Sequence, residues 1–139
     1  MKDFYELPAD RWILETEKFF VIKDGFPVSP GHCLIISKAV KVTFFELSAE
    51  EKEELVGIID AVKNIIEEEH VPDGYNIGMN CGIAAGQSVM HFHCHVIPRY
   101  AGDMRNPQGG VRYCIPGKGF IAETIELKAD STIQPEKRQ

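Results

Sequence analysis

The sequence predicts an α+β domain, in which an antiparallel sheet carries a helix on one face. Short segments rich in β-branched and aromatic residues are separated by turns that contain Gly and Pro. One long segment, residues 49–69, has apolar residues at helical spacing, and the chain order is strand, loop, strand, helix and hairpin. With 139 residues and no internal repeat or linker, we expect a single domain over 1–139, with its core at about 11–127.

The first strands come from the N-terminal quarter of the chain. Residues 11–16 and 17–23 are predicted to be two short strands joined by a tight turn, after a loose start at 1–10. Gly and Pro mark 24–31 as a loop. Residues 32–36 then form a strand whose alternate side chains face opposite sides of the sheet.

The long helix has a clear start. Ser48 is its N-cap and Glu51 reaches back to it, which is the pattern of a capping box. The helix should run from about Ala49 to Glu69 and end before Pro72. Its acidic C-terminal end opposes the helix dipole, so we expect that end to fray.

A hairpin follows the helix. Residues 75–80 are predicted to be a strand, and the small-residue loop 81–86 leads directly into the next strand. After it, residues 101–119 have the composition of a mobile loop that either covers a site or contacts a second subunit. Residues 120–127 are expected to hold a short final element, and 128–139 a polar tail.

The candidate catalytic residues lie on the second strand of that hairpin. His91, His93 and His95 occupy alternate positions, and the residues between and after them are apolar. On a strand the three imidazoles would share one face, roughly 6.5–7 Å apart, with the other face buried. Pro98 lacks a backbone donor, so the strand should end there or lie at an edge.

This row of imidazoles has three interpretations. A purely structural cluster would need a set of hydrogen-bond partners for each of three rings. Histidines are common zinc ligands, but three ligands on one straight strand converge poorly on one ion. The third interpretation is covalent catalysis at phosphorus, in which one imidazole attacks and its neighbours orient it and handle protons.

Bulk properties narrow the function further. The net charge of −6 argues against a broad nucleic-acid surface. No apolar run is long enough to span a membrane and the N-terminus lacks a signal core, so we expect a cytoplasmic protein with no membrane partner. The four cysteines are scattered without a CxxC pair, so we expect them to be reduced.

The segment His91-Phe92-His93-Cys94-His95-Val96-Ile97 resembles the His-φ-His-φ-His-φ-φ signature of the histidine triad (HIT) family. Its flanks, Gly86-Gln87-Ser88-Val89 and Ile97-Pro98-Arg99, fit the same pattern, as does the upstream Pro30-Gly31-His32. The resemblance covers about residues 12–116. It implies a five-stranded antiparallel sheet, one long and one or more short helices on one face, and a homodimer.

The resemblance also implies a reaction at the α-phosphate of a nucleotide. His93, the middle histidine, would be the nucleophile and would form a covalent nucleotidyl-histidine that water hydrolyses. His95 would lie near the bridging oxygen and help to protonate the leaving group. His91 would orient the site, with His32 hydrogen-bonded to it.

Substrate-binding residues follow from the same motif positions. They are Asn80, Gln87 and Ser88 for the phosphates, Asp24 for the ribose, and Ile22 and Leu34 for the base. No cofactor or protein-bound metal is expected, although a divalent ion can accompany a polyphosphate substrate.

Details of the resemblance favour one branch of the family. No Trp follows Trp12, whereas the nucleoside phosphoramidate branch carries a Trp-containing C-terminus. The segment from His95 to Arg99 resembles the fragile-histidine-triad branch, which implies dinucleoside polyphosphate hydrolysis with release of AMP. Ser88 also occurs in the phosphoramidate branch, which therefore stays an alternative. A purine nucleotide-binding regulatory module with incidental turnover is the other.

Overall fold

The structure is a computed structural model that describes residue 4 and residues 7–120 of the chain. The predicted element at 120–127, apart from Phe120, and the predicted tail at 128–139 lie outside the described residues. The chain divides into two compact units, Met1–Tyr100 and Ala101–Gln139. Each is described separately below.

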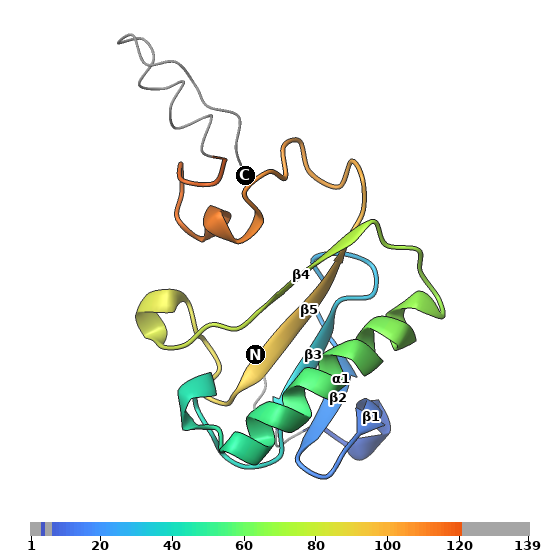
Figure 1. The fold of residues 1–139 in the computed structure, drawn as a ribbon, viewed down its shortest axis with the longest axis vertical. Coiled ribbons are helices and arrows are strands. Elements are labelled where there is room, and N and C mark those ends of the chain that lie inside the picture. Colours follow the sequence, from blue (N-terminus) through green and yellow to red (C-terminus); the bar gives the residue numbers. More distant parts are fainter. Residues whose placement is uncertain (1–3, 5–6, 121–139) are drawn as a thin grey trace, which may run out of the picture. The chain divides into compact units, whose positions relative to one another are not determined.

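The first unit contains a five-stranded sheet in which all neighbouring strands are antiparallel, as predicted (Figure 1). The strand order is β1-β2-β3-β5-β4, so the last strand in the chain lies between β3 and β4, and β4 is at the edge. The strands are β1 (Trp12–Glu15), β2 (Phe19–Lys23), β3 (Cys33–Ser37), β4 (Gly74–Gly78) and β5 (His93–Arg99). Short 3-10 turns occur in the loops between them.

The long helix, α1, spans Ala49–Glu67 and starts as predicted. The Ser48 hydroxyl accepts a hydrogen bond from the Glu51 N–H at 3.1 Å, and the Glu51 carboxylate accepts one from the Ser48 N–H at 2.7 Å. The helix ends two residues earlier than expected. The N–H groups of the next two residues bond to carbonyls only three residues back, which is the tighter turn typical of a helix end.

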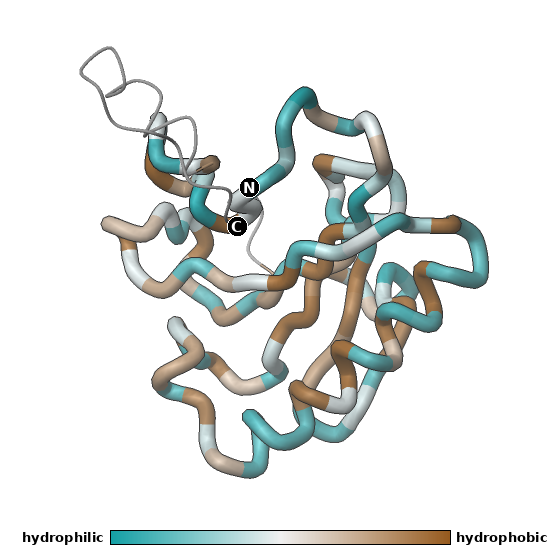
Figure 2. Tube along the Cα trace, turned by 45° about the horizontal axis from the view of Figure 1, so that its top comes forward, coloured by the Kyte–Doolittle hydropathy of each residue, from teal (hydrophilic) through white to brown (hydrophobic). Residues whose placement is uncertain are grey.

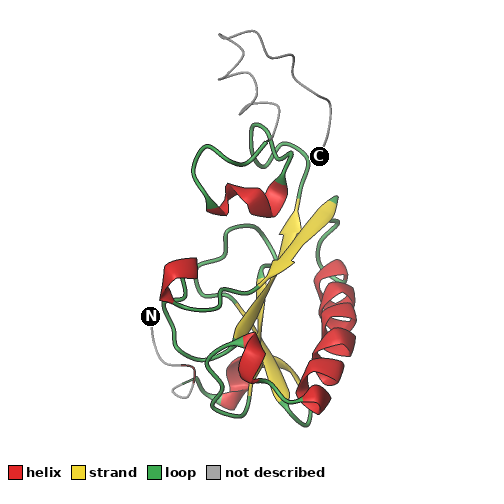
Figure 3. Cartoon of the chain, turned by 60° about the vertical axis from the view of Figure 1, so that its left-hand side comes forward, coloured by secondary structure: helices red, strands yellow, loops and turns green. Residues whose placement is uncertain are grey.

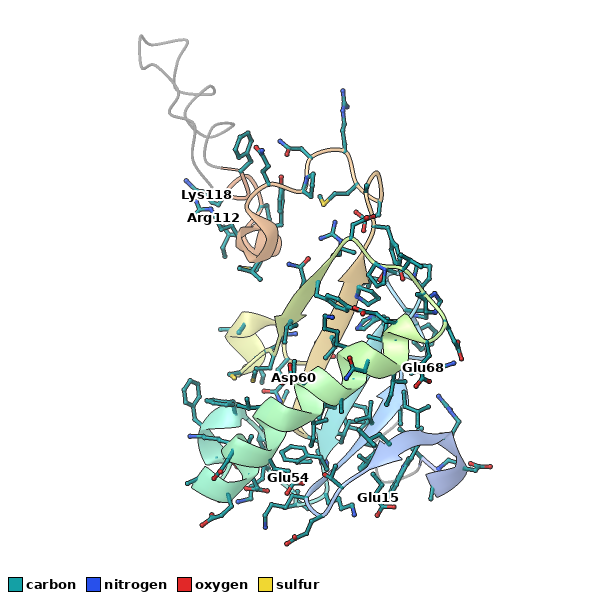
Figure 4. All side chains as sticks on the ribbon, turned by 45° about the vertical axis from the view of Figure 1, so that its right-hand side comes forward. Glu15, Glu54, Asp60, Glu68, Arg112 and Lys118 are labelled. Atoms are coloured by element: carbon teal, nitrogen blue, oxygen red, sulfur yellow. The ribbon has the colours of Figure 1, made fainter. Side chains whose placement is uncertain are left out.

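The two faces of the sheet have separate apolar clusters. Helix α1 lies over one face of the sheet (Figure 3). Its buried side chains include Leu55, Ile58, Val62 and Ile66. Asp60 on the helix and Glu68 just after its end are exposed (Figure 4). Figure 2 shows the corresponding hydrophobic colouring of the central strands. The cluster under α1 also contains Phe19, Val21, Cys33, Ile35, Leu47, Phe92, Cys94 and Val96. The opposite face carries Phe4, Phe20, Ile22, Leu34 and Ile36.

The histidine-bearing strand differs from the prediction at both ends. Strand β5 starts at His93, so His91 precedes it, and it continues through Pro98 to Arg99 in the interior of the sheet. The expectation that the strand ends at Pro98 is therefore wrong, but the alternative, a position at an edge, holds locally, because β5 pairs only with β4 at Pro98. The reason lies in the pairing: the β3–β5 ladder stops at Cys33 opposite Val96, so no β3 carbonyl needs a donor from Pro98. On that side the Pro98 carbonyl instead accepts a 2.6 Å hydrogen bond from the Ser29 hydroxyl.

The described part of the second unit, residues 101–120, contains a 3-10 helix at Gly110–Cys114. The Tyr113 hydroxyl donates to the Asn106 carbonyl at 2.6 Å, and the Arg112 guanidinium donates to the Gly119 carbonyl at 2.9 Å. Gly109 has a φ of +97°, and a Cβ there would overlap the Gly119 carbonyl. This stretch, predicted to be a loop, thus has local structure of its own.

The helices and the cysteines bear on membrane insertion and on disulfide formation. None of the helices among the described residues is both long and apolar enough to cross a membrane. The four cysteines form no disulfide with one another, and Cys33 and Cys94 are buried.

Candidate active site

His93 lies on the sheet face opposite α1. It pairs directly with Ile36, and directly opposed residues on neighbouring strands share a face. Its Nδ1 donates a 2.9 Å hydrogen bond to the backbone carbonyl of His91. Because a carbonyl can only accept, the proton sits on Nδ1, and neutral His93 keeps the lone pair of Nε2 available. This is the tautomer that a nucleophile needs.

His91 positions that carbonyl. Its own Nε2 donates a 2.6 Å hydrogen bond to the backbone carbonyl of Ser37, the last residue of β3. The side chain is buried, with 4% of the residue exposed. His91 thus connects the end of β3 to the segment that precedes β5, and it orients His93 through its backbone.

His32 and His95 form a second hydrogen-bonded pair, with 2.9 Å between His32 Nε2 and His95 Nδ1. The Val28 N–H donates to His32 Nδ1 at 3.2 Å, so neutral His32 carries its proton on Nε2 and donates it to His95. Neutral His95 then carries its own proton on Nε2. The hydrogen bonds from Val28 to His32 and from His32 to His95 therefore fix the proton of neutral His95 on its outer nitrogen, Nε2.

The expected hydrogen bond between His32 and His91 is wrong. The register of β3 and β5 places Leu34 opposite His95, so His32, two residues earlier, lies near the same end of β5. His91 lies beyond the other end of the β3–β5 pairing, level with Ser37. Antiparallel pairing reverses the order along the two strands, and the motifs alone did not reveal the register.

Burial keeps this pair neutral. Desolvation, together with the neighbouring His93 and His32, lowers the pKa of His95 to about 4, against an opposing effect of Asp24. The pKa of His32 is also lowered, mainly by desolvation, although the Asp24 charge raises it. Asp24 Oδ2 lies 3.4 Å from His32 Nε2, but this contact is an ion pair only when His32 is protonated. Near neutral pH both imidazoles are uncharged.

A pocket of about 560 Å³ opens on the same face of the sheet. It contains the three residues predicted for the ribose and the base, Asp24, Ile22 and Leu34. The Asp24 carboxylate accepts a 2.8 Å hydrogen bond from the Phe26 N–H, which fixes the start of the loop after β2. The other lining residues are Phe4, Leu7, Arg11, Gly25 and Phe26.

Phe4 links this pocket to the histidines, and the sequence interpretation missed it. Its ring lies edge-on to His91 and His93, with centroid distances of 5.7 and 5.1 Å. Only 3% of Phe4 is exposed. Leu7 and Arg11 were missed as well. Phe4 and Leu7 belong to a segment with no strand or helix periodicity, and Arg11 was expected only to begin the first strand, so no local signal indicated that these residues line the pocket.

The predicted phosphate-binding residues differ in their surroundings. Gln87 is buried, and its amide accepts from the Gly82 N–H at 2.8 Å and donates to the carbonyls of Val42 at 2.7 Å and Val89 at 3.2 Å. Gln87 therefore holds the loop between β4 and β5 in place. Asn80 and Ser88 are exposed beside the same loop. Phosphate binding by these three residues stays a prediction.

The histidines do not form the zinc site that was considered. His91 and His93 each donate a hydrogen bond to a backbone carbonyl. Among the described residues, the side chains close enough to hold an ion together are instead Asp24, His32 and His95, whose ligand atoms lie within 4.8 Å of one another. A metal there would need the lone pair of His32 Nε2, which carries the proton because Val28 donates to Nδ1. This hydrogen-bonding pattern disfavours a resident metal ion.

Comparison with known proteins agrees with this geometry. The family model "HIT domain" matches residues 6–102. The uncharacterised HIT-like protein MJ0866 of Methanocaldococcus jannaschii is 39% identical over 100 residues, which is 70% of this chain and 74% of that protein. An AP-4-A phosphorylase of Mycobacterium tuberculosis is 31% identical over 85 residues, which is 60% of this chain and 44% of the enzyme.

The fragile-histidine-triad resemblance is also supported. The nitrilase and fragile histidine triad fusion protein NitFhit of Caenorhabditis elegans is 33% identical over 99 residues, 71% of this chain and 22% of that protein. Its crystal structure superposes with a TM-score of 0.67 at 31% identity, covering 78% of this chain and 26% of NitFhit. The match thus spans only a part of these longer relatives.

The chain belongs to the HIT family, whose members bind nucleotides and are typically nucleotide hydrolases or transferases. The fold is shared with solved HIT-family structures.

Proposed function

We propose that this protein hydrolyses dinucleoside polyphosphates through a covalent nucleotidyl-His93 and releases a nucleoside monophosphate, AMP from a diadenosine compound. The observation that carries the proposal is the tautomer of His93, whose Nδ1 proton is held by the His91 carbonyl at 2.9 Å. The similarity to an AP-4-A phosphorylase supports this substrate class.

In the first step the Nε2 lone pair of His93 forms a bond to the α-phosphorus. The bond from that phosphorus to the bridging oxygen breaks, and its electron pair leaves with the oxygen. The His93 ring becomes cationic, and its proton stays on Nδ1, hydrogen-bonded to the His91 carbonyl. The Nε2–H of His95 donates a hydrogen bond to the departing oxygen and stabilises its negative charge.

In the second step a water molecule attacks the α-phosphorus. The bond from phosphorus to Nε2 breaks, its electron pair returns to the ring, and neutral His93 is restored. The water oxygen becomes part of the nucleoside monophosphate, and its proton passes to solvent. No metal or redox cofactor takes part in either step, so the proposal includes no resident cofactor.

The neutral state of His95 favours a phosphoanhydride over a phosphoramidate. A polyphosphate leaves as a stable anion, so a hydrogen bond from neutral His95 is sufficient. An amine leaving group needs a complete proton, and the pKa of His95, lowered to about 4, leaves little imidazolium near neutral pH to supply it. Phosphoramidate hydrolysis and regulatory nucleotide binding are the alternatives.

A substrate panel tests the proposal. Wild-type protein and His93→Ala are incubated with diadenosine triphosphate, diadenosine tetraphosphate, an adenosine phosphoramidate and adenylyl sulfate, and products are resolved by chromatography. We expect AMP from a dinucleotide and a loss of roughly a thousandfold or more in His93→Ala. Faster release from the phosphoramidate would favour that alternative. If no compound is turned over while AMP still binds, the regulatory module becomes the better account.

Assembly and location are part of the same proposal. Strand β4 lies at one edge of the sheet and, within the described residues, pairs only with β5. A second copy could therefore pair its β4 with this edge and form a homodimer with a continuous sheet. The acidic composition and unpaired cysteines support a cytoplasmic protein without a nucleic-acid partner. Light scattering of the purified protein would measure the oligomeric state.

A further inference from the structure

One cation lines the nucleotide pocket and has no assigned role. Arg11 ends the short 3-10 helix Ala9–Arg11, immediately before β1, and its backbone N–H donates to the Pro8 carbonyl at 2.9 Å. Among residue 4 and residues 7–120, no side chain or carbonyl forms a hydrogen bond or ion pair with its guanidinium. Its donors are thus available to a bound molecule.

The remaining pocket side chains offer a base little besides apolar contact. Phe4, Leu7, Ile22 and Leu34 are hydrophobic, and Phe26, 80% exposed, adds an aromatic ring. Stacking and apolar contact are tolerant of sequence, because every base has a π-face. These side chains therefore hold adenine and guanine about equally well. Discrimination between purines must come from a hydrogen-bonding group.

Among the described residues that line the pocket, the charged side chains are Asp24 and Arg11. The Asp24 carboxylate already accepts from the Phe26 N–H and lies 3.4 Å from His32, on the side of the histidines. Arg11 has five N–H donors and no acceptor. A guanidinium matches two adjacent acceptors, which guanine presents at O6 and N7, whereas adenine presents one acceptor at N7 beside an amino donor.

We propose that Arg11 determines base specificity and gives this pocket a preference for guanine over adenine. The inference rests on the proposed function, because it concerns the base of the nucleotide that reacts at His93. It names guanosine-containing polyphosphate conjugates as the preferred substrates within the proposed class. Diadenosine compounds remain substrates through the contacts that both purines share.

The test measures binding of GMP and AMP by titration calorimetry, so it does not depend on turnover. We expect wild-type protein to bind GMP roughly fivefold or more tightly than AMP, the lower end of what a bidentate arginine–guanine contact gives. In Arg11→Met the affinity for GMP should fall to about that for AMP, while the affinity for AMP changes little. A GMP analogue with carbon in place of N7, 7-deaza-GMP, should lose much of the preference in wild-type protein.

A matched control removes a different cation. Lys23 at the end of β2 is exposed and lies 3.6 Å from Glu69, and it is not among the pocket residues. Lys23→Met removes the same charge, so it should leave the ratio of the two affinities unchanged. A general electrostatic effect would instead lower both affinities in both variants.

Other outcomes separate this inference from the proposed function. Equal affinities for GMP and AMP, weakened equally by Arg11→Met, would mean that Arg11 stacks on any base, and would overturn the specificity while leaving the hydrolase proposal intact. A wild-type preference for AMP would also overturn it. Failure of both nucleotides to bind would refute the inference and the proposed function together.

Discussion

Replacement of His32 by Phe removes both ring nitrogens while keeping a ring of similar size in a buried position. His95 then loses the donor that fixes its tautomer, a hydrogen bond of 2.9 Å. One such bond contributes about 0.5–1.5 kcal/mol, and free choice between two tautomers costs about 0.4 kcal/mol more, RT ln 2. Together they predict a fall in kcat of roughly 5-fold to 25-fold.

Steady-state kinetics on the best substrate of the panel would measure this effect. Because His32 is a positioning residue that does not touch the base, KM should change less than kcat. The pKa of His95, followed by NMR, should also rise, because His32 is one of the groups that lower it and Asp24 would then act without that opposition. A variant that folds normally and retains the wild-type kcat, with an unchanged His95 pKa, would refute the reasoning.

Three further predictions concern stability. The pKa of His95 in the folded state is about 4, below the usual value of 6.5, so between these pH values the unfolded chain binds more protons than the folded chain. The free energy of unfolding should therefore fall as the pH is lowered from about 6.5 to 4. Denaturant titrations at several pH values measure this free energy, and its dependence on pH should be weaker in His95→Gln. Gln87→Ala removes three hydrogen bonds of the loop before β5 and should lower stability by about 1–3 kcal/mol, whereas Ser88→Ala at the exposed neighbouring position should have little effect. Ser48→Ala removes the N-cap of α1 and should cost about 0.5–2 kcal/mol by chemical denaturation, and an unchanged midpoint would contradict the role of the capping box.

The sequence predicted most of the fold because its local signals are strong. The capping box at Ser48 and the helical spacing after it placed the start of α1, and alternation placed the strands. Pro98 was misjudged because its effect depends on whether a partner strand needs its N–H. Whether a partner strand needs that N–H depends on where β3 ends. Because β3 lies about sixty residues away in the chain, no residue near Pro98 indicates it.

The candidate site was predictable where a motif carried it and not elsewhere. His93 and His95 lie on the same face as Ile22 and Leu34, because alternation on paired strands puts them there. Asp24 and His32 lie just outside the ends of β2 and β3 and approach each other beside that face. The partner of His32 depended on the register of two strands, which the motifs did not specify. Phe4 reaches the site from a segment without periodicity, and Arg11, expected in the first strand, ends a 3-10 helix instead, so only long-range packing reveals their positions.

The central claim is that the reaction proceeds through a covalent bond from His93 to the α-phosphorus. Its most direct test is the stereochemical course of hydrolysis of a dinucleotide with a chiral α-phosphorothioate, carried out in isotopically labelled water. Two successive in-line displacements, first by His93 and then by water, predict retention of configuration at phosphorus. Inversion would mean that water attacks the substrate directly, and it would contradict the account.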